Sequence, residues 1–186
     1  MIRILACRLS LIVYIGCMTA SLCPQVSFAE NCEQWVAKAV SVQGTVEAQR
    51  AGETQWRTVR LNDTYCPGDK IRVNARSRAA LALVNQPLLR LDQNTTITLG
   101  GVKQKKTSVV ELARGAVHFF SRIRRNLEVI TGFVNAGVEG TEGFIKVEED
   151  RTFISIFEGQ VLASNAAGSL TLTSGQSAVA EAGKAP

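Results

Sequence analysis

Apolar and polar residues alternate with a period near two over most of the chain after Val40, which is the pattern of half-buried β-strands. Gly, Asn, Asp or Pro interrupts this alternation every eight to twelve residues, as expected for turns between short antiparallel strands. No segment has the spacing of an amphipathic helix. The sequence therefore predicts an all-β sandwich, barrel or short solenoid. The expected strands are residues 80–83, 89–91, 97–99, 109–112, 116–123, 127–131, 144–148, 153–157, 161–164, 170–173 and 177–180.

Residues 1–29 have the composition of a secretory signal peptide. Arg3 and Arg8 precede an apolar stretch, and the small residues Ser27 and Ala29 predict cleavage before Glu30. An uncleaved membrane anchor and a lipoprotein modified at Cys17 are the alternatives. We expect a periplasmic or secreted chain with no stable membrane span after cleavage. Loss of the two arginines lowers the formal net charge from +5 to +3.

Cysteine usage changes once the signal peptide is removed, because only Cys32 and Cys66 remain. Exported chains meet an oxidising compartment, so these two cysteines are expected to form a disulfide. Closure of the intervening loop would stabilise the fold by about 3 to 4 kcal/mol. The bond would tether residues 30–37 to the domain.

Glycines recur at places where strands are expected to begin. Gly44, Gly115 and Gly159 each open a Gly-x-Val triplet, and Gly68-Asp69 is echoed by Gly175-Gln176. The intervals are unequal, so these glycines indicate corners where the backbone turns sharply or two sheets approach closely, and not a strict repeat array.

The order of these motifs resembles the FecR domain over residues 38–182, which leaves residues 183–186 as a flexible tail. The matching segments are Gly44-x-Val46, Cys66-Pro67-Gly68-Asp69-Lys70-Ile71, Ser77-x-Ala79-Ala80-Leu81-x-Leu83, Leu89-Arg90-Leu91-Asp92-x-Asn94-Thr95, Gly115-x-Val117, Gly140-Thr141, Glu158-Gly159-x-Val161 and Ser174-Gly175-Gln176. The resemblance implies an extracytoplasmic all-β domain of solenoid-like or two-sheet sandwich form. It also assigns turn roles to Gly44, Gly68, Asp69, Gly115, Gly140, Thr141, Gly159 and Gly175.

In the namesake family this domain senses the signalling domain of an outer-membrane receptor, while a cytoplasmic N-terminal part controls a sigma factor. This chain departs from that pattern because a signal peptide stands where the cytoplasmic part is expected. A second departure is Gly143, which follows Glu142 where the family usually has an aromatic or aliphatic residue. Gly143 predicts either a β-bulge or a packing gap.

Catalytic and metal-binding patterns are sparse. His118 is the one histidine, and without a second histidine or a CxxC pair the usual zinc ligands are lacking, so no metal or cofactor is expected. We interpret His118 as a structural or partly exposed strand residue. Glu139 and Glu142 could form the carboxylate pair of a hydrolase. The simpler interpretation is that both side chains face solvent beside a turn. The sequence does not predict an enzyme.

Two basic loops form the most suggestive binding feature. They comprise Lys103, Lys105 and Lys106 in one loop and Arg122, Arg124 and Arg125 in another. Together they could attract anionic lipid headgroups, an acidic glycan or an acidic protein surface, or they could simply be solvated. Trp56 is a candidate for stacking on a ligand, whereas the other aromatic residues are assigned first to the core. Nucleic acid is not an expected partner, because no exposed aromatic residues are interleaved with the basic ones.

These observations favour an exported, non-catalytic domain that mediates protein recognition, signalling or scaffolding in the cell envelope. β-Strand addition to an exposed sheet edge is the expected mechanism, because an open sheet leaves backbone donors and acceptors unpaired. A peptidoglycan-binding module that uses Trp56 and the basic loops is the second hypothesis, and a cryptic hydrolase is the third.

Overall fold

A computed structural model describes residues 34–104 and 106–186, without the side chains of residues 124 and 125. The expected signal peptide and Cys32 lie outside these residues. The described part consists of strands and turns, which confirms the all-β prediction. The strands are β1 (Ala37–Gln43), β2 (Val46–Gln49), β3 (Trp56–Thr58), β4 (Thr64–Tyr65), β5 (Lys70–Val73), β6 (Arg78–Leu83), β7 (Leu88–Leu91), β8 (Thr95–Lys103), β9 (Thr107–Phe120), β10 (Arg124–Ile130), β11 (Asn135–Val147), β12 (Arg151–Asn165), β13 (Gly168–Thr173) and β14 (Ser177–Glu181).

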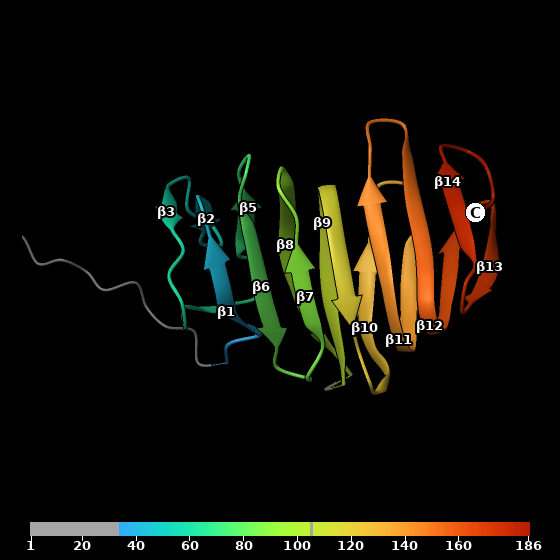
Figure 1. Ribbon diagram of the computed structural model, residues 1–186, viewed down its shortest axis with the longest axis horizontal. Coiled ribbons are helices and arrows are strands. Elements are labelled where there is room, and N and C mark those ends of the chain that lie inside the picture. The colour runs from blue at the N-terminus through green and yellow to red at the C-terminus, as the bar shows by residue number, and fades with distance from the viewer. Residues whose placement is uncertain (1–33, 105) are drawn as a thin grey trace, which may run out of the picture. The chain divides into compact units, whose positions relative to one another are not determined.

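The 14 strands form one hydrogen-bonded sheet that is folded into two layers (Figure 1). Layer 1 has the order β3, β2, β5, β8, β9, β10, β11, β12 and β13. Layer 2 has the order β4, β1, β6, β7, β9, β11, β12 and β14. The long strands β9, β11 and β12 belong to both layers, because each bends at a corner and pairs with different neighbours before and after it.

One pair of strands is parallel, in an otherwise antiparallel arrangement. After β9 has passed from layer 1 to layer 2, residues 121–123 return the chain to layer 1, where β10 runs alongside the first half of β9 in the same direction. This segment completes one coil of a solenoid. The molecule therefore combines the two expected forms. It is a two-layer sandwich built mostly from antiparallel strands, and the segment from β9 to β10 adds a single solenoid turn.

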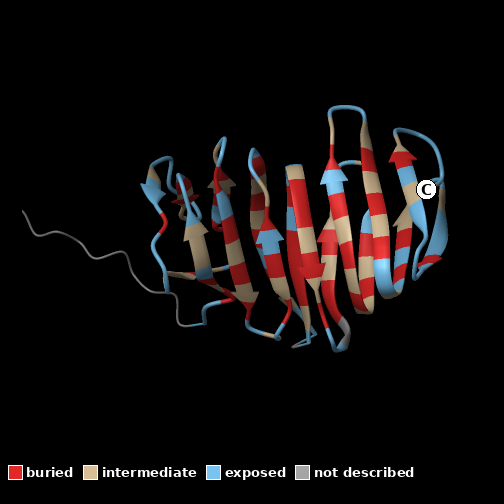
Figure 2. Ribbon diagram, in the orientation of Figure 1, coloured by how far each residue is buried: buried red, intermediate tan, exposed pale blue. Residues whose placement is uncertain are grey.

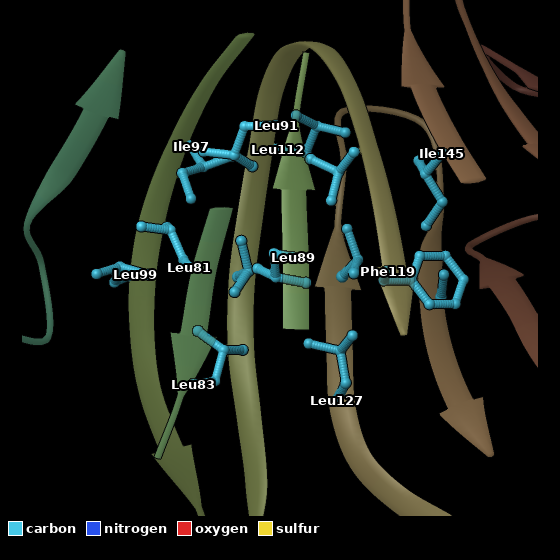
Figure 3. Packing of buried hydrophobic residues seen from close by; sticks show 14 of the residues in the cluster. Leu81, Leu83, Leu89, Leu91, Ile97, Leu99, Leu112, Phe119, Leu127 and Ile145 are labelled. Atoms are coloured by element: carbon cyan, nitrogen blue, oxygen red, sulfur yellow. The ribbon is translucent and has the colours of Figure 1, made fainter. Parts of the chain in front are cut away.

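The core lies between the layers and is built from the inward-facing residue of each alternating pair (Figure 2). Figure 3 shows leucine and isoleucine side chains from several strands packed together with Phe119. Each such side chain contributes about 1.5 to 3 kcal/mol when it is fully buried. The hydrophobic alternation in the sequence is thus the main cause of this architecture.

The assignment of the strand phenylalanines to the core is wrong for most of them. Phe119 has an exposed fraction of 0%, but Phe120, Phe144 and Phe153 are only half-buried, and Phe157 is 56% exposed. Neighbouring residues of a strand point to opposite faces, so burial of Phe119 directs Phe120 outward. In the same way, burial of the isoleucines beside Phe153 and Phe157 directs these two rings away from the core.

Within the described residues there is no helix of the length and hydrophobicity needed to cross a membrane.

Candidate interaction surfaces

The Gly-x-Val glycines lie at corners where a strand passes from one layer to the other. Gly44, Gly115 and Gly159 have φ angles of 74°, 88° and 85°, in the region that favours glycine. A Cβ atom at any of them would come within 3 Å of a neighbouring strand. The corner glycines are therefore needed both for backbone conformation and for close approach.

Each corner glycine faces a hydroxyl residue from the neighbouring strand. Gly44 faces Ser77, whose Oγ accepts the N–H of Thr45 at 2.8 Å. Gly115 faces Thr95, whose hydroxyl accepts the N–H of Ala116 at 3.0 Å and donates to the carbonyl of Ala116 at 3.1 Å.

Gly159 repeats this arrangement with Thr141, whose hydroxyl donates to the carbonyl of Glu158. The sequence motifs at the corners thus form glycine–hydroxyl pairs that satisfy backbone groups exposed by the bend. The corner glycines and their hydroxyl partners are therefore accounted for by their role in folding.

The turn between β4 and β5 is held by Asp69, which is 1% exposed. Its carboxylate accepts the N–H groups of Ala51 and Cys66, both at 2.9 Å, and Nη1 of Arg50 at 2.6 Å. Gly68 precedes it with a φ of 86°. Cys66 is half-buried in this turn, and the disulfide with Cys32 stays a prediction because Cys32 lies outside the described residues.

The remaining turn residues also lie at layer corners. Gly140 and Gly175 have φ angles of 62° and 79°. The register of β11 against β12 shifts on both sides of Glu142, so a bulge lies where Gly143 predicts one. Gly143 is buried, and a Cβ at this position would come 2.6 Å from the ring of Phe119. Glycine at this position therefore leaves room for a core aromatic residue.

The two basic loops lie at the same edge of the sandwich. Asn85 donates from Nδ2 to the carbonyl of Lys106 at 2.7 Å, and its own carbonyl accepts Nδ2 of Asn126 at 2.8 Å. Lys103 forms an ion pair with Glu128 at 2.8 Å.

Among the other predicted basic residues, Arg122 stacks over Phe120, with 5.2 Å from the guanidinium carbon to the ring centroid. Lys106 is exposed. Lys105 and the side chains of Arg124 and Arg125 lie outside what the structure describes. The structure thus brings the two loops together. Lys103 is paired with Glu128, and Arg122 is stacked on Phe120.

Trp56 is half-buried against another side chain. The guanidinium carbon of Arg72 lies 4.2 Å from the centroid of the Trp56 ring, and Arg72 is held by Glu47 at 2.8 Å. Glu47 also accepts Nδ2 of Asn74 at 2.8 Å, and the hydrogen bonds from Asn74 and Arg72 lower the pKa of Glu47. One face of the indole is therefore occupied by the protein, which leaves less surface for a stacked ligand.

The two glutamates considered for hydrolysis lie on opposite sides of a corner. Glu139 is in the part of β11 that belongs to layer 1, and Glu142 is in the part that belongs to layer 2. Glu142 is bound by His118, with 2.8 Å between Oε1 and Nε2. His118 is half-buried and points outward from β9. Within the described residues, no group of His, Cys, Asp and Glu side chains is placed to hold a metal ion.

The outer side of layer 2 is a surface that the sequence interpretation missed. We call it the aromatic face. Its apolar, aromatic and basic members point away from the core on five strands, and they are Leu88, Arg90, Ala116, His118, Phe120, Phe144, Phe153, Phe157 and Val179. The polar residues Lys146, Ser155 and Ser177 lie in the same rows. The rings of His118 and Phe157 contact each other edge to face, with centroids 5.9 Å apart. The signal was present in the sequence, because adjacent residues such as Phe119 and Phe120 cannot both face the core.

A second surface lies at the C-terminal end of the sandwich. In the described part of the chain, β13 and β14 each pair with β12 alone. Leu170 lies directly opposite Ala163, a core residue, yet Leu170 is 38% exposed because it lies on the last strand of layer 1. Residues 183–186, expected as a flexible tail, run near the turn between β12 and β13, where Asn165 donates to the carbonyl of Lys184 at 2.7 Å.

Solved structures with this fold are found among bacterial proteins. Two crystal structures of a "putative anti-sigma factor" from Parabacteroides distasonis ATCC 8503 each match with a TM-score of 0.56 and 16% sequence identity over 63% of this chain. The match covers 56% of one crystal chain and 57% of the other, so this chain spans little more than half of their length. No curated protein sequence matches this chain.

The sequence itself identifies the family. The profile of the family described as FecR protein matches residues 69–162. That segment begins at the buried Asp69, contains the corner pairs formed by Thr95 with Gly115 and Thr141 with Gly159, and spans half of the chain. The chain therefore belongs to the FecR family.

Proposed function

We propose that this chain is an exported, non-catalytic FecR-family module that recognises a protein partner in the cell envelope. Membership of the FecR family supports a regulatory or signalling role. The signal-peptide pattern of residues 1–29 supports export to the envelope. The mechanism we favour is addition of a partner strand to the edge formed by β13.

The observation that carries this proposal is the open C-terminal end of layer 1. Leu170 faces the interior but keeps 38% of its surface exposed, whereas Leu172 on the same strand is 3% exposed. A strand paired with β13 would cover Leu170 and satisfy the outer backbone groups of β13. Both effects favour association, since one buries apolar surface and the other forms main-chain hydrogen bonds.

The N-terminal end of the sandwich is a poorer template for strand addition. Its outermost strands, β3 and β4, have three and two residues, against six in β13. Short edge strands are one of the devices by which proteins prevent edge pairing. The contrast between the two ends directs the proposal to β13.

The test compares two charged substitutions on the same strand. Leu170→Lys places a charge on the inward side of the edge, and Thr171→Lys places it on the outward side, where Thr171 is already exposed. A partner captured from envelope extract is purified and titrated against the full chain and both variants. We expect saturable binding that Leu170→Lys weakens at least about tenfold and Thr171→Lys leaves nearly unchanged.

Hydrogen exchange supplies the second measurement. The backbone amides of β13 should exchange more slowly in the complex, while those of β2 keep their rates. The proposal fails if no saturable protein partner is found, or if the partner binds Leu170→Lys as tightly as the parent without protecting β13. Retention on peptidoglycan alone would favour the glycan-binding alternative.

A further inference from the structure

The β7 end of the aromatic face carries an arginine that has no partner within the described residues. Arg90 lies between Ala80 of β6 and His118 of β9 in a row across the strands that continues to Phe144 of β11. Arg90 is exposed and forms no ion pair, hydrogen bond or ring contact within the described residues. Its position above the small side chain of Ala80 leaves the guanidinium accessible.

The other charges around Arg90 are mostly engaged with one another. The ion pairs are Arg78 with Asp92 at 3.2 Å, Lys146 with Glu148 at 2.7 Å and Arg151 with Glu148 at 3.0 Å, and Glu142 is hydrogen-bonded to His118 at 2.8 Å. Among the described residues, Arg90 is therefore a cation that an incoming anion meets at this hollow without displacing a paired carboxylate. Glu142, the closest acid on β11, is turned towards His118.

Arg90 is one of the residues around a mostly apolar hollow of about 240 Å³. The others are Arg78, Leu91, Asp92, Ala116, His118 and Phe144. Ala116 provides room because its side chain is small, and Phe144 provides an aromatic wall. The hollow is suited to one bulky apolar side chain beside the guanidinium.

We propose that this hollow and Arg90 form a recognition site for a protein segment that presents a carboxylate next to a bulky apolar side chain. The planar guanidinium matches a carboxylate through two parallel hydrogen bonds. The apolar side chain would pack against Phe144 and Ala116 and remove both from water. The phenylalanines of this face carry no hydroxyl or amide groups, so an apolar peptide side chain suits it better than a sugar.

This site is separate from the β13 edge, and it does not depend on strand addition there. The row that contains Arg90 begins on β6 and β7, on the far side of β9 and β11 from β13. Failure of one proposal therefore leaves the other standing, and Leu170→Lys should leave the Arg90 site unaffected.

The experiment is an NMR titration of the ¹⁵N-labelled chain with four capped hexapeptides in a Gly-Ser frame. Their two central residues are Glu-Phe, Gln-Phe, Glu-Ala and Gln-Ala. We expect the Glu-Phe peptide to shift the amide signals of residues 90, 118 and 144. Replacement of either central residue should weaken binding by about fivefold or more, because each removes one of the two interactions.

Two arginine variants complete the test. Arg90→Gln should weaken binding of the Glu-Phe peptide by about fivefold or more. Arg60 is an exposed arginine in the loop between β3 and β4, and Arg60→Gln should leave the affinity unchanged. Both variants should unfold at the parent temperature, because both side chains are exposed. Equal affinity for the four peptides, equal binding by Arg90→Gln and the parent, or no shift at peptide concentrations of about 5 mM would overturn the proposal.

Discussion

The corners of the sandwich and the aromatic face both carry unusual residues, but for different reasons. At the corners, Gly115 and Gly159 adopt positive φ angles and contact the hydroxyl residues Thr95 and Thr141. On the aromatic face, Phe157 is 56% exposed and Phe120, Phe144 and Phe153 are half-buried, because all four side chains point away from the core. The glycine motifs thus mark how the chain bends. The phenylalanines of the aromatic face lie outside the family motifs, whereas Arg90 lies within one of them, at residues 89–95.

The outer side of layer 1 strengthens this contrast. Its outward positions are mostly polar or charged, and they include Glu47, Arg72, Thr96, Thr98, Glu111, Glu128 and Gln160. The two layers share one core and similar strand lengths, so folding does not require one outer side to be aromatic. The difference between the two outer sides is the reason that the proposed recognition site is placed on layer 2.

The largest expected effect separates the two faces of a single strand. Phe119→Ala should lower the free energy of unfolding by about 3 to 5 kcal/mol, because Phe119 is fully buried. Phe120→Ala should lower it by less than about 1 kcal/mol, because Phe120 points outward. Urea unfolding of both variants measures the difference. Equal losses would mean that the aromatic face contributes to stability as the core does.

The next effect tests whether a corner glycine is needed for more than its φ angle. Gly159→Ala combines a strained backbone with a Cβ within 3 Å of Gly140 and Thr141, and should cost about 3 kcal/mol or more. Gly175→Ala has a similar φ of 79° with no atom within 4 Å, and should cost about 1 kcal/mol. Thermal unfolding of the pair separates close approach from conformation. If both variants lose the same stability, the glycine–hydroxyl contact has no importance of its own.

A somewhat smaller loss is expected when the turn between β4 and β5 loses its carboxylate. Asp69→Ala leaves two N–H groups without their acceptor and removes the ion pair with Arg50, whose Nη1 keeps only the carbonyl of Thr64 at 3.0 Å. This loss should cost about 2 to 3 kcal/mol. Asp63→Ala is the matched control, because Asp63 accepts a single exposed hydrogen bond from the N–H of Arg60 and should cost less than about 1 kcal/mol. Urea midpoints of the two variants that coincide would contradict the central role of Asp69.

The smallest effect concerns the polar outer side of layer 1 and depends on pH. Asn74 and Arg72 lower the pKa of Glu47 in the folded state. Ionised Glu47 therefore stabilises the folded state at pH values above the usual pKa range of a glutamate side chain. This contribution is lost as pH falls through the lowered pKa. The stability advantage of the parent over Glu47→Gln should therefore be present at neutral pH and disappear in acid, as followed by urea unfolding across pH. An advantage that grows on acidification would contradict this sign.

Much of the fold could be predicted from the sequence, as β9 and β12 illustrate. The alternation locates strands at 109–112 and 116–123, and the structure joins residues 109–112 and 116–120 into β9 with a bend at Gly115. Residues 121–123, also predicted as strand, form the connection to β10. The structure likewise joins 153–157 and 161–164 into β12 around Gly159. The first half of β11, Asn135–Glu139, was not predicted, because its asparagine and glycine resemble a turn. The interaction surfaces were predicted less well. The residue type of Phe144 and Phe157 is that of a core residue, and it does not show whether the side chain faces the core or water.

The sequence by itself determined the strand class and the corner positions, and it marked Gly143 as the site of either a bulge or a packing gap. These properties depend on a period of two and on the backbone freedom of single residues, both of which are local. Only the tertiary structure decided that β10 runs parallel to β9, that the two basic loops share an edge, and that Arg90 lies beside an apolar hollow. Those properties depend on which strands become neighbours, and pairing between distant segments is set by the burial of the whole core, which no short stretch of sequence encodes.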